Sequence, residues 1–120
     1  MKLILVEDDP LILLCTSDAL AEAGFEVQTA IRGEEALGLL SDAADCVLMM
    51  VDVRLGGRID GWEVARRARN ARPDIAMVYT TTADGLAFDR ECVDRSVLLQ
   101  KPYTLDRAVT AAREACRMVG

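Results

Sequence analysis

Five short apolar runs divide the chain at regular intervals. They are rich in Val, Ile, Leu and Met, and they span residues 2–6, 25–29, 46–51, 75–80 and 96–100. The run Cys46–Val51 has no polar residue at alternate positions, which is typical of a strand buried on both faces of a parallel sheet. Gly56, Gly57 and Gly61 follow it and predict a loop. Asp52 is therefore expected at the carboxyl end of a central strand.

The segments between these runs carry helix signals. Asp9-Pro10 is typical of an N-cap and a first helical position, Asp60 and Thr104 are typical of further N-caps, and Gly24 is typical of a helix end. These signals predict helices over residues 10–23, 33–40, 60–71, 84–92 and 104–118. The expected buried stripe of the first helix consists of Ile12, Cys15, Ala19, Leu20 and Ala23.

Strand and helix segments alternate strictly, with short connections and no repeat or linker. This alternation predicts an α/β fold, with one domain over residues 1–120 and a doubly wound parallel sheet of five strands covered by five helices in three layers. Right-handed crossovers place the carboxyl ends of all strands at one edge. If the first and third strands are neighbours at the switch point, side chains at these ends meet in one crevice.

Composition and charge exclude several classes of function. The chain has a formal net charge of −6 and no histidine. The negative charge argues against a nucleic-acid surface, and the lack of histidine removes Ser-His-Asp catalysis, His-ligated zinc and a phosphohistidine carrier. The four cysteines show no CxxC spacing, and no stretch has the length of a signal peptide or a membrane span. These features predict a reduced, cytoplasmic protein without membrane insertion.

Polar side chains stand where the predicted strands end. Glu7 and Asp8 follow the first strand, Asp52 the third, Thr81 the fourth and Lys101 the fifth. Three carboxylates in one crevice repel one another unless a cation lies among them. The available ligands are all oxygen, which favours Mg²⁺ in an octahedron at roughly 2.0–2.1 Å. The expected chemistry is phosphoryl transfer to a carboxylate.

The roles of the other two side chains follow from the charge of a phosphoryl group. A carboxylate is a modest nucleophile, so positioning and charge neutralisation must lower most of the barrier. Lys101 can act as a point charge on one side of the group. The hydroxyl of Thr81 can donate to a phosphoryl oxygen and draw the following loop toward it.

These residues resemble a known family. The segments ILVEDDP, VDVRL followed by Asp60-Gly61, VYTT and QKPY occur in this order on alternating β and α segments, as in the receiver domain of two-component response regulators. The resemblance spans essentially the whole chain. It implies a flavodoxin-like sheet with strand order 2-1-3-4-5 and a cis peptide bond between Lys101 and Pro102.

The resemblance also implies the roles of the site residues. Asp52 would be the phosphoacceptor, and Thr81 and Lys101 would assist it. The Mg²⁺ ligands would be carboxylates of the first and third strand ends and one main-chain carbonyl: Glu7, Asp8, Asp52 and Arg54.

A stand-alone receiver is the function that the resemblance implies, although the chain can also be part of a longer regulator. It would take its phosphoryl group from a histidine kinase or a phosphotransfer protein. It would then act by protein–protein binding or phosphorelay, and would be no enzyme beyond its own phosphorylation and dephosphorylation. Exposed Leu11 and Leu14, which lie on one side of the first helix, form a candidate docking patch for the helical donor.

Three positions depart from the usual receiver pattern. Leu98 stands where receivers often carry a switching aromatic residue in mid-strand five. The loop around Gly56-Gly57-Arg58 has one additional residue, and Thr82 stands where Ala or Gly is usual. These departures predict that signalling depends on movement of loops and helices rather than on a Thr-to-aromatic coupling.

Two other functions are compatible with parts of the pattern. A pseudo-receiver would bind partners without phosphorylation. A phosphatase of the haloacid dehalogenase type also uses a strand-end aspartate, but it needs a second aspartate two residues later, and Arg54 is found there. The arginines of the third helix are expected to form a solvated face rather than a nucleic-acid surface: Arg66, Arg67, Arg69 and Arg72.

Overall fold

A single parallel sheet with strand order β2-β1-β3-β4-β5 forms the centre of the protein. The computed structural model describes residues 1–82 and 85–119. The strands are β1 (Lys2–Val6), β2 (Glu26–Ala30), β3 (Cys46–Asp52), β4 (Ala76–Thr81) and β5 (Ser96–Gln100). The helices are α1 (Pro10–Glu22), α2 (Gly33–Asp42), α3 (Gly61–Ala71), α4 (Gly85–Glu91) and α5 (Leu105–Val119). This is the predicted flavodoxin-like α/β fold.

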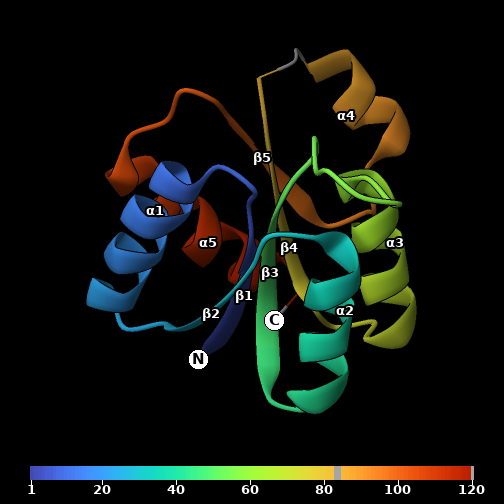
Figure 1. Cartoon of the computed structure of the whole chain (residues 1–120), viewed down its shortest axis with the longest axis horizontal. Coiled ribbons are helices and arrows are strands. Elements are labelled where there is room, and N and C mark those ends of the chain that lie inside the picture. Colours follow the sequence, from blue (N-terminus) through green and yellow to red (C-terminus); the bar gives the residue numbers. More distant parts are fainter. Residues whose placement is uncertain (83–84, 120) are drawn as a thin grey trace.

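The helices cover the sheet from both sides, α1 and α5 on one face and α2, α3 and α4 on the other (Figure 1). Successive residues of a strand point to opposite faces, so each strand contributes to two separate apolar cores. In β3, Met49 and Val51 pack toward α2 and α3, whereas Leu48 and Met50 pack toward α1 and α5. This double burial explains why the sequence of β3 shows no polar alternation.

Most predicted element boundaries agree with the structure within two residues. Asp9, Asp60 and Thr104 each accept a hydrogen bond from a main-chain N–H one turn into the following helix, as expected of N-caps. Gly24 has φ +104°, the left-handed conformation expected after a helix end. Strands β2 and β4 begin and end one residue later than predicted. The predicted start of the fourth helix, at Asp84, lies outside the described residues.

The predicted buried stripe of α1 is only partly confirmed. Leu20 is buried as predicted, whereas three further members of the stripe are half-buried: Ile12, Ala19 and Ala23. Cys15 is exposed, and the neighbouring Thr16 is buried instead. A buried hydroxyl is tolerated when it is hydrogen-bonded, and the Oγ1 atom of Thr16 lies 2.8 Å from the hydroxyl oxygen of Tyr103. This contact with the β5–α5 connection turns Thr16 inward.

Two of the four arginines that were predicted to form a solvated face on the third helix do not belong to such a face. The side chain of Arg69 is only 9% exposed, and its guanidinium donates to the main-chain oxygens of Ile75, Asp94 and Arg95. Arg72 donates to the main-chain oxygens of Leu40, Ala43 and Cys46. Both side chains therefore hold the amino-terminal edge of the sheet. Arg66 and Arg67 are exposed and pair with Glu63, as expected of a solvated face.

Candidate functional site

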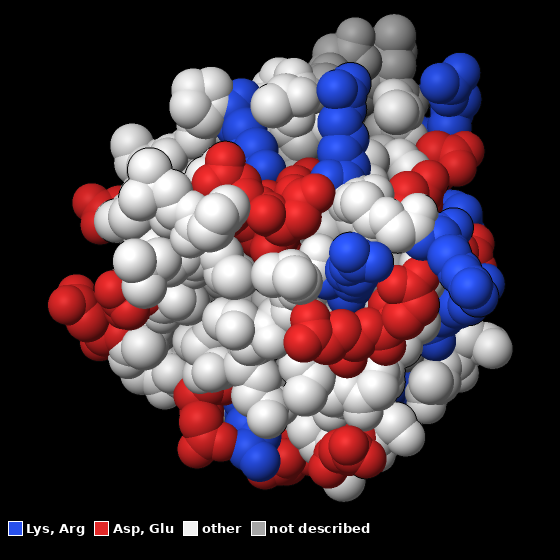
Figure 2. Space-filling view, viewed as in Figure 1, with Lys and Arg blue, Asp and Glu red and all other residues white. Residues whose placement is uncertain are grey.

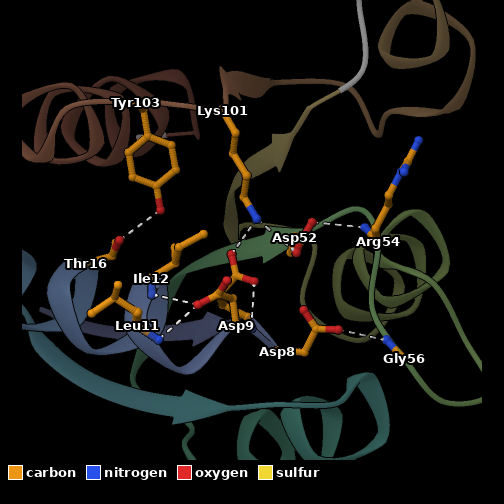
Figure 3. A network of polar contacts seen from close by, with 11 residues as sticks. Asp8, Asp9, Leu11, Ile12, Thr16, Asp52, Arg54, Gly56, Lys101 and Tyr103 are labelled. Atoms are coloured by element: carbon orange, nitrogen blue, oxygen red, sulfur yellow. Dashed lines mark hydrogen bonds and ion pairs between the residues drawn. The ribbon is translucent and has the colours of Figure 1, made fainter.

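The side chain of Lys101 joins two buried carboxylates at the carboxyl edge of the sheet (Figure 3). Its Nζ lies 2.7 Å from Oε1 of Glu7 and 3.1 Å from Oδ2 of Asp52. Glu7 is 2% exposed and Asp52 is 5% exposed. Glu7 follows β1, Asp52 ends β3 and Lys101 follows β5, so the strand order brings together three positions that are far apart in the sequence. The predicted convergence at this edge is confirmed for Glu7, Asp52 and Lys101.

Asp8 completes a cluster of three acids. Glu7, Asp8 and Asp52 each offer a carboxylate oxygen, and these oxygens all lie within 4.8 Å of one another. Asp8 is exposed, whereas the other two are buried. An all-oxygen donor set of this size, open to solvent on one side, suits a hard divalent cation that keeps some of its water.

The main chain around Asp52 fixes the direction of its carboxylate. Its Oδ1 accepts a hydrogen bond from the N–H of Arg54 at 3.0 Å, while Oδ2 faces Lys101. The N–H of Gly61 donates to the main-chain oxygen of Val53 at 2.9 Å. A Cβ atom on Gly61 would collide with the main-chain oxygen of Asp52 and lie 2.6 Å from Cα of Val53. The Asp60-Gly61 pair therefore lets α3 begin directly against the strand end that carries Asp52.

Burial and the neighbouring charges set the pKa values of this site. Burial of Glu7, opposed by Lys101 and reinforced by Asp52, raises the pKa of its carboxyl from 4.5 to about 7. Burial disfavours the ammonium of Lys101, but its hydrogen bonds to Glu7 and Asp52 outweigh this effect and raise the pKa of Lys101. In the protein without a cation, the carboxyl of Glu7 is therefore about half protonated near neutral pH.

We expect the metal-free protein to become less stable as pH rises from about 5 to 7.5. A carboxyl group with a raised pKa binds its proton more tightly in the folded state, so stability is lost between the ordinary value of 4.5 and about 7. The expected loss is roughly 1–3 kcal/mol in the free energy of unfolding. Urea denaturation in EDTA across this range measures it.

The control for this prediction is Glu7→Gln, which should have a much flatter profile. The chain has no histidine, so no other side chain has its ordinary pKa inside this interval. An equally steep fall of stability in Glu7→Gln would show that another group carries the titration.

The other predicted site residues lie close by. Thr81 is the last residue of β4 and is 2% exposed, and its main-chain oxygen accepts a hydrogen bond from the N–H of Lys101 at 2.8 Å. The side chain of Arg54 projects away from Asp52 (Figure 3). The peptide bond between Lys101 and Pro102 is cis, as predicted. Leu98 packs against the core on the α3 side, where the aromatic rings of Trp62, Tyr79 and Phe88 also meet.

Sequence reasoning missed the contacts that hold the acid cluster in place. The N–H of Asp9 donates to Oε2 of Glu7 at 3.1 Å, and the N–H of Gly56 donates to Oδ2 of Asp8 at 3.3 Å. These contacts depend on loop geometry. The pair Gly56-Gly57 was the available signal, because a two-glycine loop can bring main-chain N–H groups close to a carboxylate.

An apolar cavity opens beside the acid cluster. It has a volume of about 400 Å³ and lies between the start of α1 and the β5–α5 connection. Its walls include Leu11, Ile12, Tyr103 and Leu105, and Lys101 lies at its border with the acids. Leu11 and Leu14 are 68% and 59% exposed, which confirms the exposure predicted for both.

Charge is distributed unevenly around this edge. Acidic side chains gather over the carboxyl ends of the strands, and a further acidic group lies over α2 (Figure 2). Lysine and arginine side chains border both groups. Within the described residues, no helix has the length and hydropathy needed to cross a bilayer.

The fold and the acid–lysine site together define a flavodoxin-like α/β domain with an acidic pocket at the switch point of its sheet. The model of the response regulator receiver domain family matches residues 3–113. The chain belongs to this family. Receiver domains bind Mg²⁺ at an acidic pocket, interact with histidine kinases and downstream targets, and are generally non-enzymatic signalling modules.

Curated relatives and solved structures agree with this assignment. The chain is 33% identical over 120 residues to the transcriptional regulatory protein TcrA of Mycobacterium tuberculosis, covering 98% of this chain and 46% of TcrA. It is 29% identical to the response regulator MprA of Mycolicibacterium vanbaalenii, covering 98% of this chain and 51% of MprA. The chain thus spans about half the length of these relatives.

A solved response regulator receiver protein from Sinorhizobium medicae has a TM-score of 0.93 and 29% identity, covering 100% of this chain and 97% of that one. A receiver domain protein described as CheY-like, from Methanospirillum hungatei, has a TM-score of 0.84 and 22% identity, covering 98% of this chain and 94% of that one. At this level of identity, the similarity concerns the fold alone.

Proposed function

We propose that this receiver domain accepts a phosphoryl group on Asp52 in a Mg²⁺-dependent reaction. One observation carries the proposal: Oδ2 of the buried Asp52 lies 3.1 Å from Lys101 Nζ, in a cluster whose remaining acids are Glu7 and Asp8. A buried carboxylate beside one lysine and two further acids has more negative charge than the lysine balances. This surplus suits a divalent cation and a phosphoryl group better than it suits a purely structural ion pair.

In the proposed reaction, a carboxylate oxygen of Asp52 forms a bond to phosphorus. The bond from phosphorus to the donor breaks, either to the imidazole nitrogen of a phosphohistidine or to the acyl oxygen of a small acyl phosphate. The leaving group takes the electron pair of that bond. Lys101 balances the charge on one side of the phosphoryl group, and Thr81 donates its hydroxyl to a phosphoryl oxygen. Water later attacks the phosphorus of phosphorylated Asp52, which releases inorganic phosphate and restores the carboxylate.

The residues present fit a magnesium ion. Each carboxylate oxygen of the cluster has a second lone pair beyond its hydrogen bond, and no thiolate or imidazole competes. Glu7, Asp8, Asp52 and the main-chain carbonyl of Arg54 would hold the ion, which neutralises phosphoryl oxygens when it is bound. Binding of the cation also favours the carboxylate form of Glu7 over the protonated form.

Intact-mass spectrometry tests the proposed function. The protein is incubated with a small acyl phosphate in Mg²⁺ or in EDTA, and we expect one phosphoryl group per chain in Mg²⁺ and none in EDTA. Peptide mapping should place the group on Asp52. A protein that gains no phosphoryl group in saturating Mg²⁺ would instead be a pseudo-receiver.

The donor is proposed to be a histidine kinase or a phosphotransfer protein, which docks on α1. Leu11 is exposed at the apolar cavity beside the site, and Leu105 is 44% exposed on the other side of this cavity. Leu14 is exposed on α1 three residues after Leu11. An apolar strip beside the acceptor suits the apolar face of a helix that presents a phosphohistidine.

We expect Leu14→Arg to slow phosphotransfer from a phosphohistidine donor by about tenfold or more, because a charge replaces an apolar contact. Labelling by acyl phosphate should stay unchanged, since Leu14 lies outside the acid cluster. Met118→Arg is the matched control, because Met118 is also an exposed apolar residue, 43% exposed, on a different helix. Equal transfer rates for Leu14→Arg and the wild type would remove α1 from the donor surface.

The output of the proposed domain is phosphorylation-dependent protein binding or phosphorelay in the cytoplasm, either alone or within a longer regulator. A phosphatase activity on other substrates is disfavoured. Arg54 occupies the position of the second aspartate that such enzymes require, and its side chain projects away from Asp52. The Leu98 position favours signal output through movement of loops and helices.

A further inference from the structure

Three acidic side chains hold the loop that connects β3 to α3. Oδ1 of Asp52 accepts from the N–H of Arg54 at 3.0 Å, and Oδ2 of Asp8 accepts from the N–H of Gly56 at 3.3 Å. Further along, Oε1 of Glu34 accepts from the N–H of Arg58 at 3.3 Å. The loop is thus fixed near its beginning, its middle and its end by carboxylates from three different elements.

Close packing of α2 brings Glu34 to this loop. Glu34 is in the first turn of α2, directly after Gly33. A Cβ atom on Gly33 would collide with Val64 of α3 and would lie 2.8 Å from Cγ1 of Ile59 in the loop. Glycine therefore allows the first turn of α2 to lie against the loop and α3. Glu34 then reaches the main-chain N–H of Arg58, which a more distant helix would leave without this contact.

The loop has the backbone shape that this contact requires. Gly57 has φ +103°, a left-handed conformation that other residues rarely adopt. A Cβ atom built on Gly57 would lie 3.5 Å and 3.8 Å from the two carboxylate oxygens of Glu34, so the chain passes directly over this carboxylate.

The three acids differ in their roles in cation and phosphoryl binding, and this comparison rests on the proposed function. Asp8 and Asp52 belong to the cluster that would hold the cation, and Asp52 would also take the phosphoryl group. Both carboxylates would then be drawn toward these ligands, which compete with the N–H groups of Gly56 and Arg54. Glu34 is not part of the cluster. It can keep its hydrogen bond to the loop before and after the cation binds.

We propose that Glu34 is a positioning residue: by holding the N–H of Arg58, it keeps the β3–α3 loop close to the acid cluster, so that the loop's main chain completes cation binding. The carbonyl of Arg54, a proposed ligand, is on this loop. Without Glu34 the loop has to be ordered when the cation binds, and this ordering reduces the affinity.

A simpler role for Glu34 is to stabilise the positive end of α2 by its charge. Glu35 provides the matched control for this role. It is in the same helical turn and has the same charge, but its Oε1 accepts from the N–H of Ile31, just before α2, at 2.8 Å. A general effect of charge or of helix stability should appear in variants of both glutamates. An effect on the loop should appear only in variants of Glu34.

Calorimetric titration with MgCl₂ tests the proposal on the whole chain, with four variants beside the wild type. Glu34→Ala should bind Mg²⁺ about three- to tenfold more weakly, as expected for the loss of one ordinary, solvent-exposed hydrogen bond. Glu34→Gln keeps an oxygen acceptor and should stay within about twofold of the wild type. Glu35→Ala and Glu35→Gln should also stay within about twofold. Amide hydrogen exchange should become faster at Arg58 in Glu34→Ala alone.

The rate of labelling by acyl phosphate is a second measurement, which should not change if Glu34 only stabilises the fold. Glu34→Ala should be labelled slowly at low Mg²⁺ and at the wild-type rate at saturating Mg²⁺. Equal Mg²⁺ affinities for Glu34→Ala and Glu35→Ala, with a wild type that is labelled, would overturn the proposal and leave the proposed function intact. Weak binding by Glu34→Gln as well as Glu34→Ala would also overturn it, since charge and not the hydrogen bond would then be responsible. A wild-type protein that neither binds Mg²⁺ nor is labelled would overturn both the role of Glu34 and the proposed function.

Discussion

Asp52→Asn is expected to take up no phosphoryl group from an acyl phosphate, even in saturating Mg²⁺. An amide has no anionic oxygen to attack phosphorus, and it is a much poorer ligand for Mg²⁺. The amide oxygen can still accept the hydrogen bond from the N–H of Arg54, so the loop after β3 should keep its place. The measurement is intact mass after incubation, compared with the wild type under the same conditions.

Asp9→Asn is the matched control for this variant. Asp9 is adjacent to the cluster, but its carboxylate caps α1 through the N–H groups of Leu11 and Ile12. Asparagine caps helices about as well as aspartate, so Asp9→Asn should fold and be labelled like the wild type. Labelling of Asp52→Asn at the wild-type level would move the acceptor to another residue and refute the proposed mechanism.

The second large effect is expected for Lys101→Met. Methionine fills much of the same space without charge, and it leaves Glu7 and Asp52 buried beside each other without a cationic partner. Removing one partner of a buried ion pair typically reduces stability by about 3–5 kcal/mol. Protonation of Glu7 relieves part of this loss, because the lysine no longer lowers the pKa of its carboxyl. Urea denaturation in EDTA at pH 8 should show the largest difference from the wild type.

Phosphoryl uptake should fall about a hundredfold or more in Lys101→Met at saturating Mg²⁺, since one side of the transferring group loses its positive charge. Lys101→Arg is the control that keeps the charge. It should regain much of the stability but only part of the rate, because a planar guanidinium cannot take the place of a compact ammonium between two carboxylates. A wild-type rate of uptake in Lys101→Met would exclude a role of this lysine in the transfer.

Much of the fold was predictable because apolar runs and helix caps are local signals. Cys46–Val51 marks the central strand without reference to any other segment, and Asp9 and Asp60 mark helix starts by their own hydrogen bonds. The edge at which the strand ends meet also follows from the alternation of strands and helices. That Glu7, Asp52 and Lys101 lie in one place on this edge required in addition the strand order 2-1-3-4-5, which the resemblance to receiver domains implied and the alternation alone did not.

The features that sequence reasoning got wrong or missed depend on distant partners. The periodicity of α1 places Cys15 inside, but the hydroxyl of Tyr103 makes burial of Thr16 favourable instead. Arg69 resembles a surface residue until the carbonyls that it contacts are known. The contact of Glu34 with the N–H of Arg58 depends on how closely α2 packs against α3. No local pattern contains this information.

The two arginine side chains that hold the amino-terminal edge of the sheet, one buried (Arg69) and one half-buried (Arg72), affect how the protein tolerates mutation. Arg69 and Arg72 contact the connections before β3, β4 and β5 mainly through main-chain oxygens: those of Leu40, Ala43, Cys46, Ile75, Asp94 and Arg95. Every residue type carries a main-chain oxygen, so sequence drift in these connections leaves the contacts intact. Evolutionary freedom at that edge should thus be wide for the connections and narrow for the two guanidinium groups.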